Sequence, residues 1–323
     1  MSETTQAAAL SLRVAEAVEI VPGIHRFELR DPGDAELPVF TPGAHITVEV
    51  PDAGLRKYSL CNDPDERHRY VIAVKREDSG RGGSARLIAG VSAGARLTCG
   101  FPRNDFPLAE RATGFLFIAG GIGVTPILSM VRHLKATGRA HFKLYYCTRS
   151  PGSTAFHDEL SAPEFRGEIF FHHDHGDPER SLDLWPLLER PVAGTHVYCC
   201  GPRPLLEAVR DMTGHWSTSA IHFESFVDAA AMRTLDDRPF RVRLARSGAV
   251  VDVPADRSIL DALREAGSDV PSSCESGTCG TCRTRLVDGE ADHRDLVLTD
   301  AEREDQIMVC VSRAKSAELT IDR

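Results

Sequence analysis

The first hundred residues alternate short apolar stretches with Pro and Gly. The apolar–polar alternation of half-buried strands appears over residues 14–20, 25–29, 45–50 and 69–75. Residues 1–11 lack this pattern and are expected to form an N-terminal tail. The pattern predicts a β-rich first domain over residues 1–107.

The middle of the chain changes to strands that alternate with helical stretches. Residues 115–119 form a continuous apolar run, typical of a strand buried on both faces of a parallel sheet. A glycine-rich turn follows, with Thr125 as the expected N-cap of a helix over residues 127–134. Residues 197–200 predict a second buried strand, and residues 205–212 a helix. The alternation predicts an α/β domain over residues 108–226.

The last quarter of the chain begins after residues 227–237, which have small side chains and no strand character, and which we interpret as a linker. Strand-like runs at 240–244 and 250–253 precede a helix that begins after Ser258 and ends at Gly267. These elements predict a small β-rich domain with one helix over residues 238–323.

This last domain carries four cysteines with iron–sulfur spacing: Cys274, Cys279, Cys282 and Cys310. The order C-x4-C-x2-C, followed by a distant cysteine, is the one with which plant-type ferredoxins hold a 2Fe–2S cluster. Disulfides are disfavoured because the N-terminus does not resemble a secretory signal. A four-cysteine zinc site more often has two C-x2-C pairs, and only Cys279 and Cys282 form one. The spacing favours the cluster.

Two turns of the α/β domain are candidates for binding a nucleotide. Gly120, Gly121 and Gly123 precede the predicted helix at Thr125, and a glycine turn at a helix N-terminus exposes N–H groups that suit a pyrophosphate. The second turn is Cys200-Gly201-Pro202. Ligands of open α/β sheets lie beyond the carboxyl ends of the strands, so both turns are expected to line one pocket. A tight turn that binds nothing is the alternative for the first. The run from His172 to His175 is expected to be a solvated loop.

The first domain has a candidate anion site. Arg56 and Tyr58 share one face of a strand. An arginine suits a phosphate dianion, and a tyrosine ring can cover an aromatic cofactor. The loop Gly82-Gly83-Ser84 precedes a short predicted helix, and the N–H groups at the start of this helix are a second candidate for binding an anion. A surface Arg-Tyr pair and an ordinary hairpin loop are the alternative.

The net charge and hydrophobicity of the chain bear on which partners it could bind. The formal net charge is −9, which argues against nucleic acid and an anionic membrane as partners. No apolar run approaches the roughly 20 residues of a membrane helix. We expect a cytoplasmic protein, and a monomer because no segment suggests an oligomer surface.

Taken together, the order Arg-x-Tyr-Ser, Gly-Gly-Ile-Gly-Val-Thr-Pro, Cys-Gly-Pro and a C-terminal cysteine loop resembles the phthalate dioxygenase reductase family. This family of class IA oxygenase reductases includes the reductases of vanillate O-demethylase and phenoxybenzoate dioxygenase. The resemblance covers nearly the whole chain. It implies three domains: an antiparallel β-barrel that binds FMN, an α/β domain that binds NADH, and a β-grasp plant-type ferredoxin domain.

The resemblance also assigns residues. Arg56 and Ser84 would hold the FMN phosphate, Tyr58 and Ser59 would lie at the isoalloxazine with the Ser59 hydroxyl near N5, and Thr125 and Cys200 would flank the nicotinamide. Phe226 would stack on the flavin or, equally, anchor the linker in a core. The remaining cofactor residues implied are Lys57, Ala73, Val74, Lys75, Gly82, Gly83, Gly120, Gly121, Gly123, Thr148, Arg149, Gly201 and Pro202. Thr148 and Arg149 follow a strand where an adenosine ribose should lie, and the absence of an acid there leaves NADPH open beside NADH.

The implied function is electron transfer from NADH through FMN and the 2Fe–2S cluster to a separate Rieske-type oxygenase acting on an aromatic compound. Two alternatives stay open. One is a stand-alone NAD(P)H flavin or metal reductase with a regulatory ferredoxin domain. The other is an electron carrier without hydride chemistry.

Overall fold

The computed structural model describes residues 9–78, 82–226, 232, 234 and 236–323. The chain divides into two compact units, residues 1–202 with 215–222, and residues 203–214 with 223–323. The domain boundaries drawn from the sequence stay predictions. Much of the predicted linker, 227–231 with 233 and 235, lies outside the described residues.

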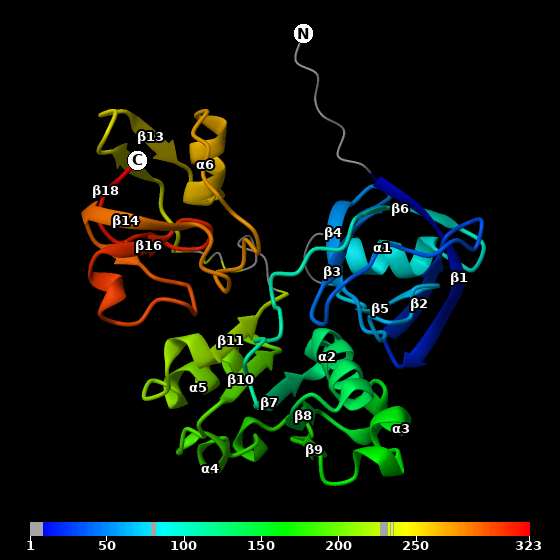
Figure 1. The fold of residues 1–323 in the computed structure, drawn as a ribbon. Coiled ribbons are helices and arrows are strands. Elements are labelled where there is room, and N and C mark those ends of the chain that lie inside the picture. Colours follow the sequence, from blue (N-terminus) through cyan, green and yellow to red (C-terminus); the bar gives the residue numbers. More distant parts are fainter. Residues whose placement is uncertain (1–8, 79–81, 227–231, 233, 235) are drawn as a thin grey trace. The chain divides into compact units, whose positions relative to one another are not determined.

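The first part of unit one is an antiparallel sheet in the order β4-β3-β6-β1-β2-β5 (Figure 1). A bridge between Leu60 and Ile72 joins the end of β4 to β5, so the sheet closes on itself. This confirms the β-barrel. The elements are β1 (Ala9–Val21), β2 (Ile24–Arg30), β3 (His45–Val50), β4 (Gly54–Ser59), β5 (Tyr70–Lys75), α1 (Gly83–Gly90) and β6 (Arg96–Gly100).

The alternation of apolar residues explains the barrel core. On β3, for example, Ile46, Val48 and Val50 are buried while Glu49 is exposed. The predicted tail is wrong at its end, because residues 9–11 belong to β1 and pair with β6, starting with Ala9 opposite Gly100. This pairing satisfies main-chain groups that a free tail would leave to water.

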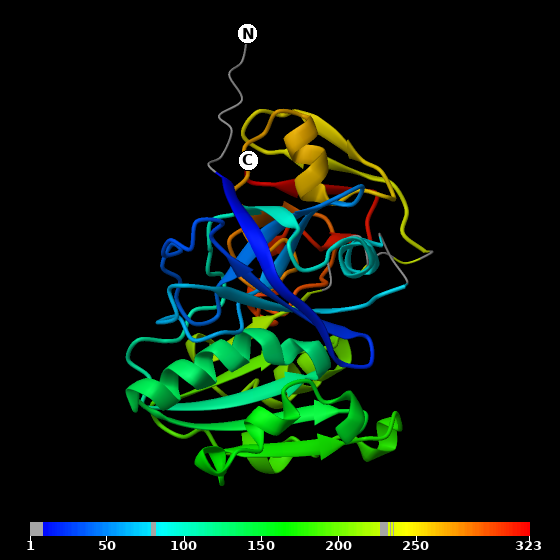
Figure 2. The same ribbon diagram turned by 90° about the vertical axis from the view of Figure 1, so that its right-hand side faces the viewer.

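The α/β part of the chain has a five-stranded sheet in the order β11-β10-β7-β8-β9. It belongs to unit one except for helix α5 and the end of β11, which fall in unit two. Strands β10, β7, β8 and β9 are parallel, as the apolar run at 115–119 predicted. Helix α2 packs on β7, β8 and β10 and lies along one face of the sheet (Figure 2). The elements are β7 (Gly114–Gly120), α2 (Val124–Thr137), β8 (His141–Thr148), α3 (His157–Leu160), β9 (Ile169–His173), α4 (Trp185–Leu188), β10 (Thr195–Cys200), α5 (Arg203–Met212) and β11 (Ile221–Glu224). None of the helices within the described ranges has the length and apolarity needed to cross a membrane.

Thr125 is not the N-cap of α2, which corrects the sequence prediction. A 3₁₀ turn, η1 (Gly121–Gly123), leads directly into α2, so the chain is already helical at Val124. The Thr125 hydroxyl donates to the carbonyl oxygen of Ile122 at 3.0 Å and does not cap a free N–H. No side chain caps the start of the helix, and the Val124 N–H bonds instead to carbonyl oxygens of the 3₁₀ turn.

The C-terminal part of unit two is a mixed sheet in the order β13-β12-β18-β14-β16. β12 and β18 are parallel and the other pairs are antiparallel. Helix α6 packs against β13, and the arrangement confirms the β-grasp domain. The elements are β12 (Phe240–Leu244), β13 (Val250–Val253), α6 (Ile259–Glu265), β14 (Arg283–Asp288), β15 (Ala291–Asp292), β16 (Gln306–Met308), β17 (Arg313–Ala314) and β18 (Glu318–Ile321).

The predicted cap of α6 is confirmed. Ser258 Oγ accepts from Asp261 N at 3.0 Å, and Asp261 Oδ2 accepts from Ser258 N at 3.3 Å. The two bonds form a capping box that fixes the start of the helix. Gly267 lies just past the C-terminus with a left-handed φ of 80°, which glycine adopts without strain.

Candidate functional site

The residues predicted to bind a flavin phosphate come together where β4 passes the start of α1. The Arg56 side chain lies over Gly83, since a Cβ on this glycine would be 2.4 Å from Arg56 Nε. Gly82 precedes the helix with a φ of 69°, and no side chain caps the helix. Ser84 Oγ accepts a hydrogen bond from Glu77 N at 2.9 Å. A guanidinium beside uncapped helical N–H groups suits a phosphate, so these residues fit FMN.

The predicted isoalloxazine residues lie on both sides of the bridge that closes the barrel, which we call the closing seam (Leu60, Cys61, Val71 and Ile72). Tyr58 and Ser59 end β4, and Ala73 and Val74 belong to β5. Burial raises the pKa of the Tyr58 phenol to about 12, so this ring stays neutral. Ser59 is buried and pairs across the sheet with His45.

Not all of these side chains point the same way. Val74 is buried in the barrel core, whereas Ala73 packs with Ile24 and Ala155 in a separate cluster that extends to the α/β part. The two predicted lysines are exposed and paired with acids. Lys75 Nζ lies 2.7 Å from Glu77, and Lys57 Nζ lies 3.9 Å from Asp105.

The two predicted nucleotide turns touch each other. Gly123 packs on the backbone of the second turn, because a Cβ there would be 2.3 Å from the Cys200 oxygen and 2.8 Å from Gly201 N. Gly121 has a φ of 53° and Gly120 ends β7. Thr125 and Cys200 are both buried, and Pro202 begins the chain that leads to α5. The structure thus brings both turns to one edge of the sheet, as the position of the strand ends predicted.

The predicted ribose residues follow β8. Thr148 is buried, and its hydroxyl lies 2.7 Å from Thr154 Oγ1 and 2.9 Å from His173 Nδ1. Arg149 is exposed at the same edge of the sheet. In the neighbouring histidine run, His172 Nε2 contacts the Arg180 oxygen at 2.7 Å. Asp174 follows β9 at the same edge, where its N–H donates to the Thr148 oxygen at 3.2 Å. An exposed guanidinium and a nearby carboxylate therefore leave the ribose site open to either nucleotide.

The four cysteines form two pairs of thiols. The hydrogen bond from the Cys279 thiol lowers the pKa of Cys274, and the same contact raises the pKa of Cys279. The contact between Cys282 and Cys310 acts likewise, lowering the pKa of Cys282 and raising that of Cys310. Two pairs suit a two-iron cluster, in which four thiolates are shared between two irons. Among the described residues, His, Cys, Asp and Glu side chains form no group of three or more suited to a single metal ion.

The cysteine loop turns main-chain N–H groups toward sulfur. Ser276 N points at Cys274 Sγ at 3.4 Å, and Cys274 N points at Cys279 Sγ at 3.5 Å. Gly277 has a φ of 75° and leaves no room for a side chain, because a Cβ would lie 2.7 Å from Val311 Cγ2. N–H groups directed at thiolates stabilise a negatively charged cluster, so the loop fits a 2Fe–2S centre.

The sequence did not reveal Arg132, which joins the barrel to the α/β part of unit one. Its guanidinium donates to the Cys61 oxygen and makes a bidentate pair with Glu159, at 2.7 and 2.6 Å. The arginine is therefore a fixed link between α2 and the closing seam.

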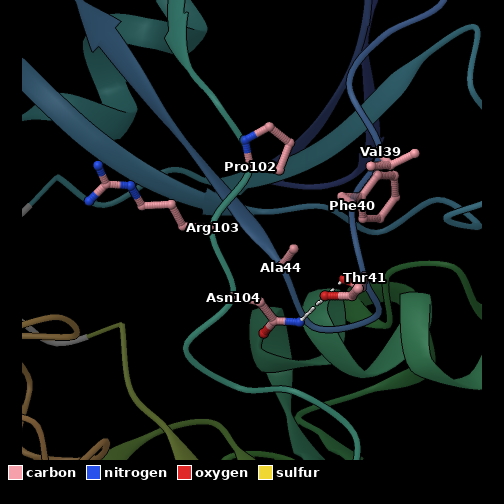
Figure 3. A pocket seen from close by; sticks show the side chains of 7 residues that line it. All are labelled: Val39, Phe40, Thr41, Ala44, Pro102, Arg103 and Asn104. Carbon is pink, nitrogen blue, oxygen red and sulfur yellow. Dashed lines mark hydrogen bonds between the residues drawn. The ribbon is translucent and has the colours of Figure 1, made fainter. Parts of the chain in front are cut away.

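Two further features are a hollow on the barrel and the side chain of Phe226. A hollow of about 210 Å³ on the barrel, lined by residues outside the predicted set, is shown in Figure 3, where Asn104 Nδ2 donates to Thr41 Oγ1 at 2.7 Å. Phe226, predicted to stack on the flavin, is half exposed in unit two. Its role stays a prediction.

Known proteins resemble this chain over the parts that carry these sites. Residues 117–211 match the family model of the oxidoreductase NAD-binding domain, and residues 242–315 match the 2Fe-2S iron-sulfur cluster binding domain. The chain is 55% identical over 312 residues to the phthalate 4,5-dioxygenase oxygenase reductase subunit of Pseudomonas putida, which covers 96% of each chain. It is 42% identical over 294 residues to a vanillate O-demethylase oxidoreductase of Pseudomonas putida, covering 90% of this chain and 92% of the relative.

The fold gives the same result. A solved structure of phthalate dioxygenase reductase, described as modular and as transferring electrons from pyridine nucleotides to [2Fe-2S], is 54% identical. It covers 98% of both chains with a TM-score of 0.72. Sequence, domain models and fold therefore agree that this chain belongs to the phthalate dioxygenase reductase family of oxidoreductases.

Proposed function

We propose that the chain is the reductase component of a Rieske-type aromatic oxygenase, either a dioxygenase or an O-demethylase. Electrons enter from NADH, pass through FMN and the 2Fe–2S cluster, and leave to the separate oxygenase. One observation carries this proposal: a nucleotide-binding α/β part and a ferredoxin-type cysteine loop occur in one chain, as in relatives named as oxygenase reductase subunits.

The chain's own residues bind and orient in this scheme. Arg56 and the start of α1 hold the flavin phosphate, while Tyr58 and Ser59 contact the ring. The touching turns at Gly123 and Cys200 would hold the nicotinamide beside Thr125 and Cys200, and the burial of these two side chains would keep water away from it. The four paired thiols hold the cluster. Bound flavin supplies the exchange between two-electron hydride chemistry and one-electron transfer.

The ribose edge sets the choice of nucleotide. Arg149 is exposed beside Thr148, and a carboxylate that would accept from the ribose 2′-hydroxyl does not follow β8 directly. We propose NADH as the donor on the family likeness. NADPH use would follow if Arg149 paired with a 2′-phosphate.

An anaerobic titration with NADH and, separately, NADPH tests the proposal by visible absorbance. Bleaching of both the flavin and the broad cluster band by one nucleotide supports the electron path and fixes the preference. Bleaching of the flavin alone would contradict transfer to the cluster. No response to either nucleotide would contradict the reductase itself.

The charge of the ferredoxin domain indicates how it would dock on the oxygenase. Residues 237–323 contain 13 basic and 17 acidic side chains, a net charge of −4. We propose docking on a basic patch of the oxygenase, by a cytoplasmic, monomeric reductase. The rate of partner reduction should then fall as salt rises. A rate independent of salt would contradict this docking mode.

A further inference from the structure

Asp237 is a buried carboxylate at the entrance to the ferredoxin domain. It precedes β12 and its side chain is 4% exposed. Arg294 makes a bidentate pair with it, with Nη2 2.5 Å from Oδ1 and Nη1 3.1 Å from Oδ2. Arg313, itself buried, lies 3.6 Å from Oδ2. Arg294 Nε also donates to Asp292 Oδ2 at 2.7 Å, so two guanidiniums and two carboxylates form one network. This network holds the backbone at Asp237 on the domain.

The residues before Asp237 join the same network. Thr234 Oγ1 donates to Asp237 Oδ1 at 3.0 Å, and Arg294 Nη1 donates to the Met232 oxygen at 3.0 Å. The Met232 side chain packs on the core of the ferredoxin domain. Met232, Thr234 and Asp237, which we call the anchor residues, are thus bound to the domain although they come before its first strand.

Arg294 connects this anchor to the cysteine loop. The residues that follow it lie directly on the loop: Leu296 N donates to the Gly277 oxygen at 3.0 Å. Asp295 is fully buried, and its Oδ2 accepts from Leu298 N at 2.8 Å. A Cβ on Gly277 would lie 3.2 Å from the Asp295 Cα. The anchor is therefore one residue away from a segment that packs on the cluster ligands' loop.

We propose that Asp237 is a positioning residue for electron transfer, because its pair with Arg294 ties the connecting chain to the cluster side of the ferredoxin domain. This inference rests on the proposed function, since it concerns reduction of the cluster by one electron from the flavin. With the anchor in place, the connection to the domain ends at Met232. Without it, the next fixed point along the chain is Arg238, whose oxygen accepts from Arg313 Nη2 at 3.0 Å, so the connection lengthens. Effective concentration falls as a tether lengthens, so electron transfer slows.

The test compares Asp237→Asn with Asp322→Asn in the full chain. Asp322 makes a bidentate pair with Arg246 on the surface of the same domain, so it is the matched control. Hydrogen exchange of peptides containing Thr234 and Asp237 reads the anchor directly. Stopped-flow mixing with nucleotide under anaerobic conditions separates flavin reduction from cluster reduction. EPR reports cluster content and environment.

For Asp237→Asn we expect faster exchange at the anchor, unchanged flavin reduction and EPR signal, and cluster reduction slowed roughly threefold or more. Asp237→Glu should recover most of the rate, and Asp322→Asn should behave as wild type. Wild-type exchange and transfer in Asp237→Asn would overturn the inference. Loss of the EPR signal would also overturn it, because Asp237 would then support the cluster and not the connection. If the wild type fails to reduce its cluster, the proposed function is wrong. The hydrogen exchange of Asp237→Asn, compared with that of the wild type, still tests whether Asp237 holds the anchor residues on the domain.

Discussion

Replacing Gly123 with alanine tests whether contact between the two nucleotide turns sets the geometry of hydride transfer. The new Cβ would lie 2.3 Å from the Cys200 oxygen. Carbon and oxygen atoms in close contact stay about 3.3 Å apart. The turns must therefore separate by roughly 1 Å, the difference between these two distances. The Cys200 oxygen and the nearby Gly201 N are both backbone atoms, which cannot rotate away as a side chain would.

Two effects of different size follow. Overpacking of this kind costs about 1–3 kcal/mol of stability, which lowers the Tm by roughly 2–12 °C for a unit of this length. A misplacement of about 1 Å between reacting groups can cost roughly 100-fold in rate. We therefore expect flavin reduction by saturating NADH to slow by about two orders of magnitude, with flavin content and fold retained.

Stopped-flow absorbance of the flavin measures the rate, and Gly138→Ala is the matched control. Gly138 ends the same helix with a φ of 60°, and a Cβ there meets no atom within 4 Å. Its substitution adds backbone strain of about 1–2 kcal/mol far from the turns. Flavin reduction in Gly138→Ala should match wild type. If Gly123→Ala also reduced its flavin at the wild-type rate, the contact between the turns would not position the nicotinamide.

The remaining predictions concern the cofactors and pH. Arg56→Ala removes a charge-assisted phosphate contact of roughly 1.5–3 kcal/mol, so FMN should be lost on desalting, whereas Arg76→Ala, at an exposed arginine, should keep it. Cys279→Ser should abolish the rhombic EPR signal of the reduced cluster while NADH oxidation with ferricyanide persists; a retained signal would disprove the ligand assignment. Burial, and then His196, lower the pKa of His222 to about 4 from 6.5. The unfolded chain binds this proton first as pH falls, so the free energy of unfolding should drop between pH 6.5 and 4, by about 3 kcal/mol. Urea denaturation of His222→Gln should show a flatter profile, and an unchanged slope would count against this assignment.

Features made by residues close together in the sequence could be predicted. The N-cap at Ser258 and the cysteine loop depend on spacings of a few residues, and the structure has both. The start of α2 could not be predicted in the same way. Thr125 has the chemistry of an N-cap, but the 3₁₀ turn before it already makes the chain helical. Whether a suitable residue acts as an N-cap depends on its backbone angles, and the residue type alone does not fix these angles.

Features that join distant residues were visible only through the family resemblance, or not at all. Arg56 and Gly83 meet because the barrel brings β4 to the start of α1, and periodicity carries no such information. Arg132 was missed because a charged residue in a helix is normally expected to face solvent. Its partners, the Cys61 oxygen and Glu159, lie far from it in the sequence. The Asp237 network is hidden for the same reason.

The closing seam has a consequence for the apoprotein. β3 and β4 share a continuous ladder, whereas β4 meets β5 through the Leu60–Ile72 bridge and a bond from Cys61 N to the Val71 oxygen at 2.9 Å. A junction with so few main-chain bonds is where local opening begins. The family resemblance predicts flavin contacts on both sides of this seam, at Tyr58 and Ala73. A flavin bound in that way would bind only the closed form, so binding and barrel closure would be one linked equilibrium. Cofactor loading would then complete the closure of this barrel.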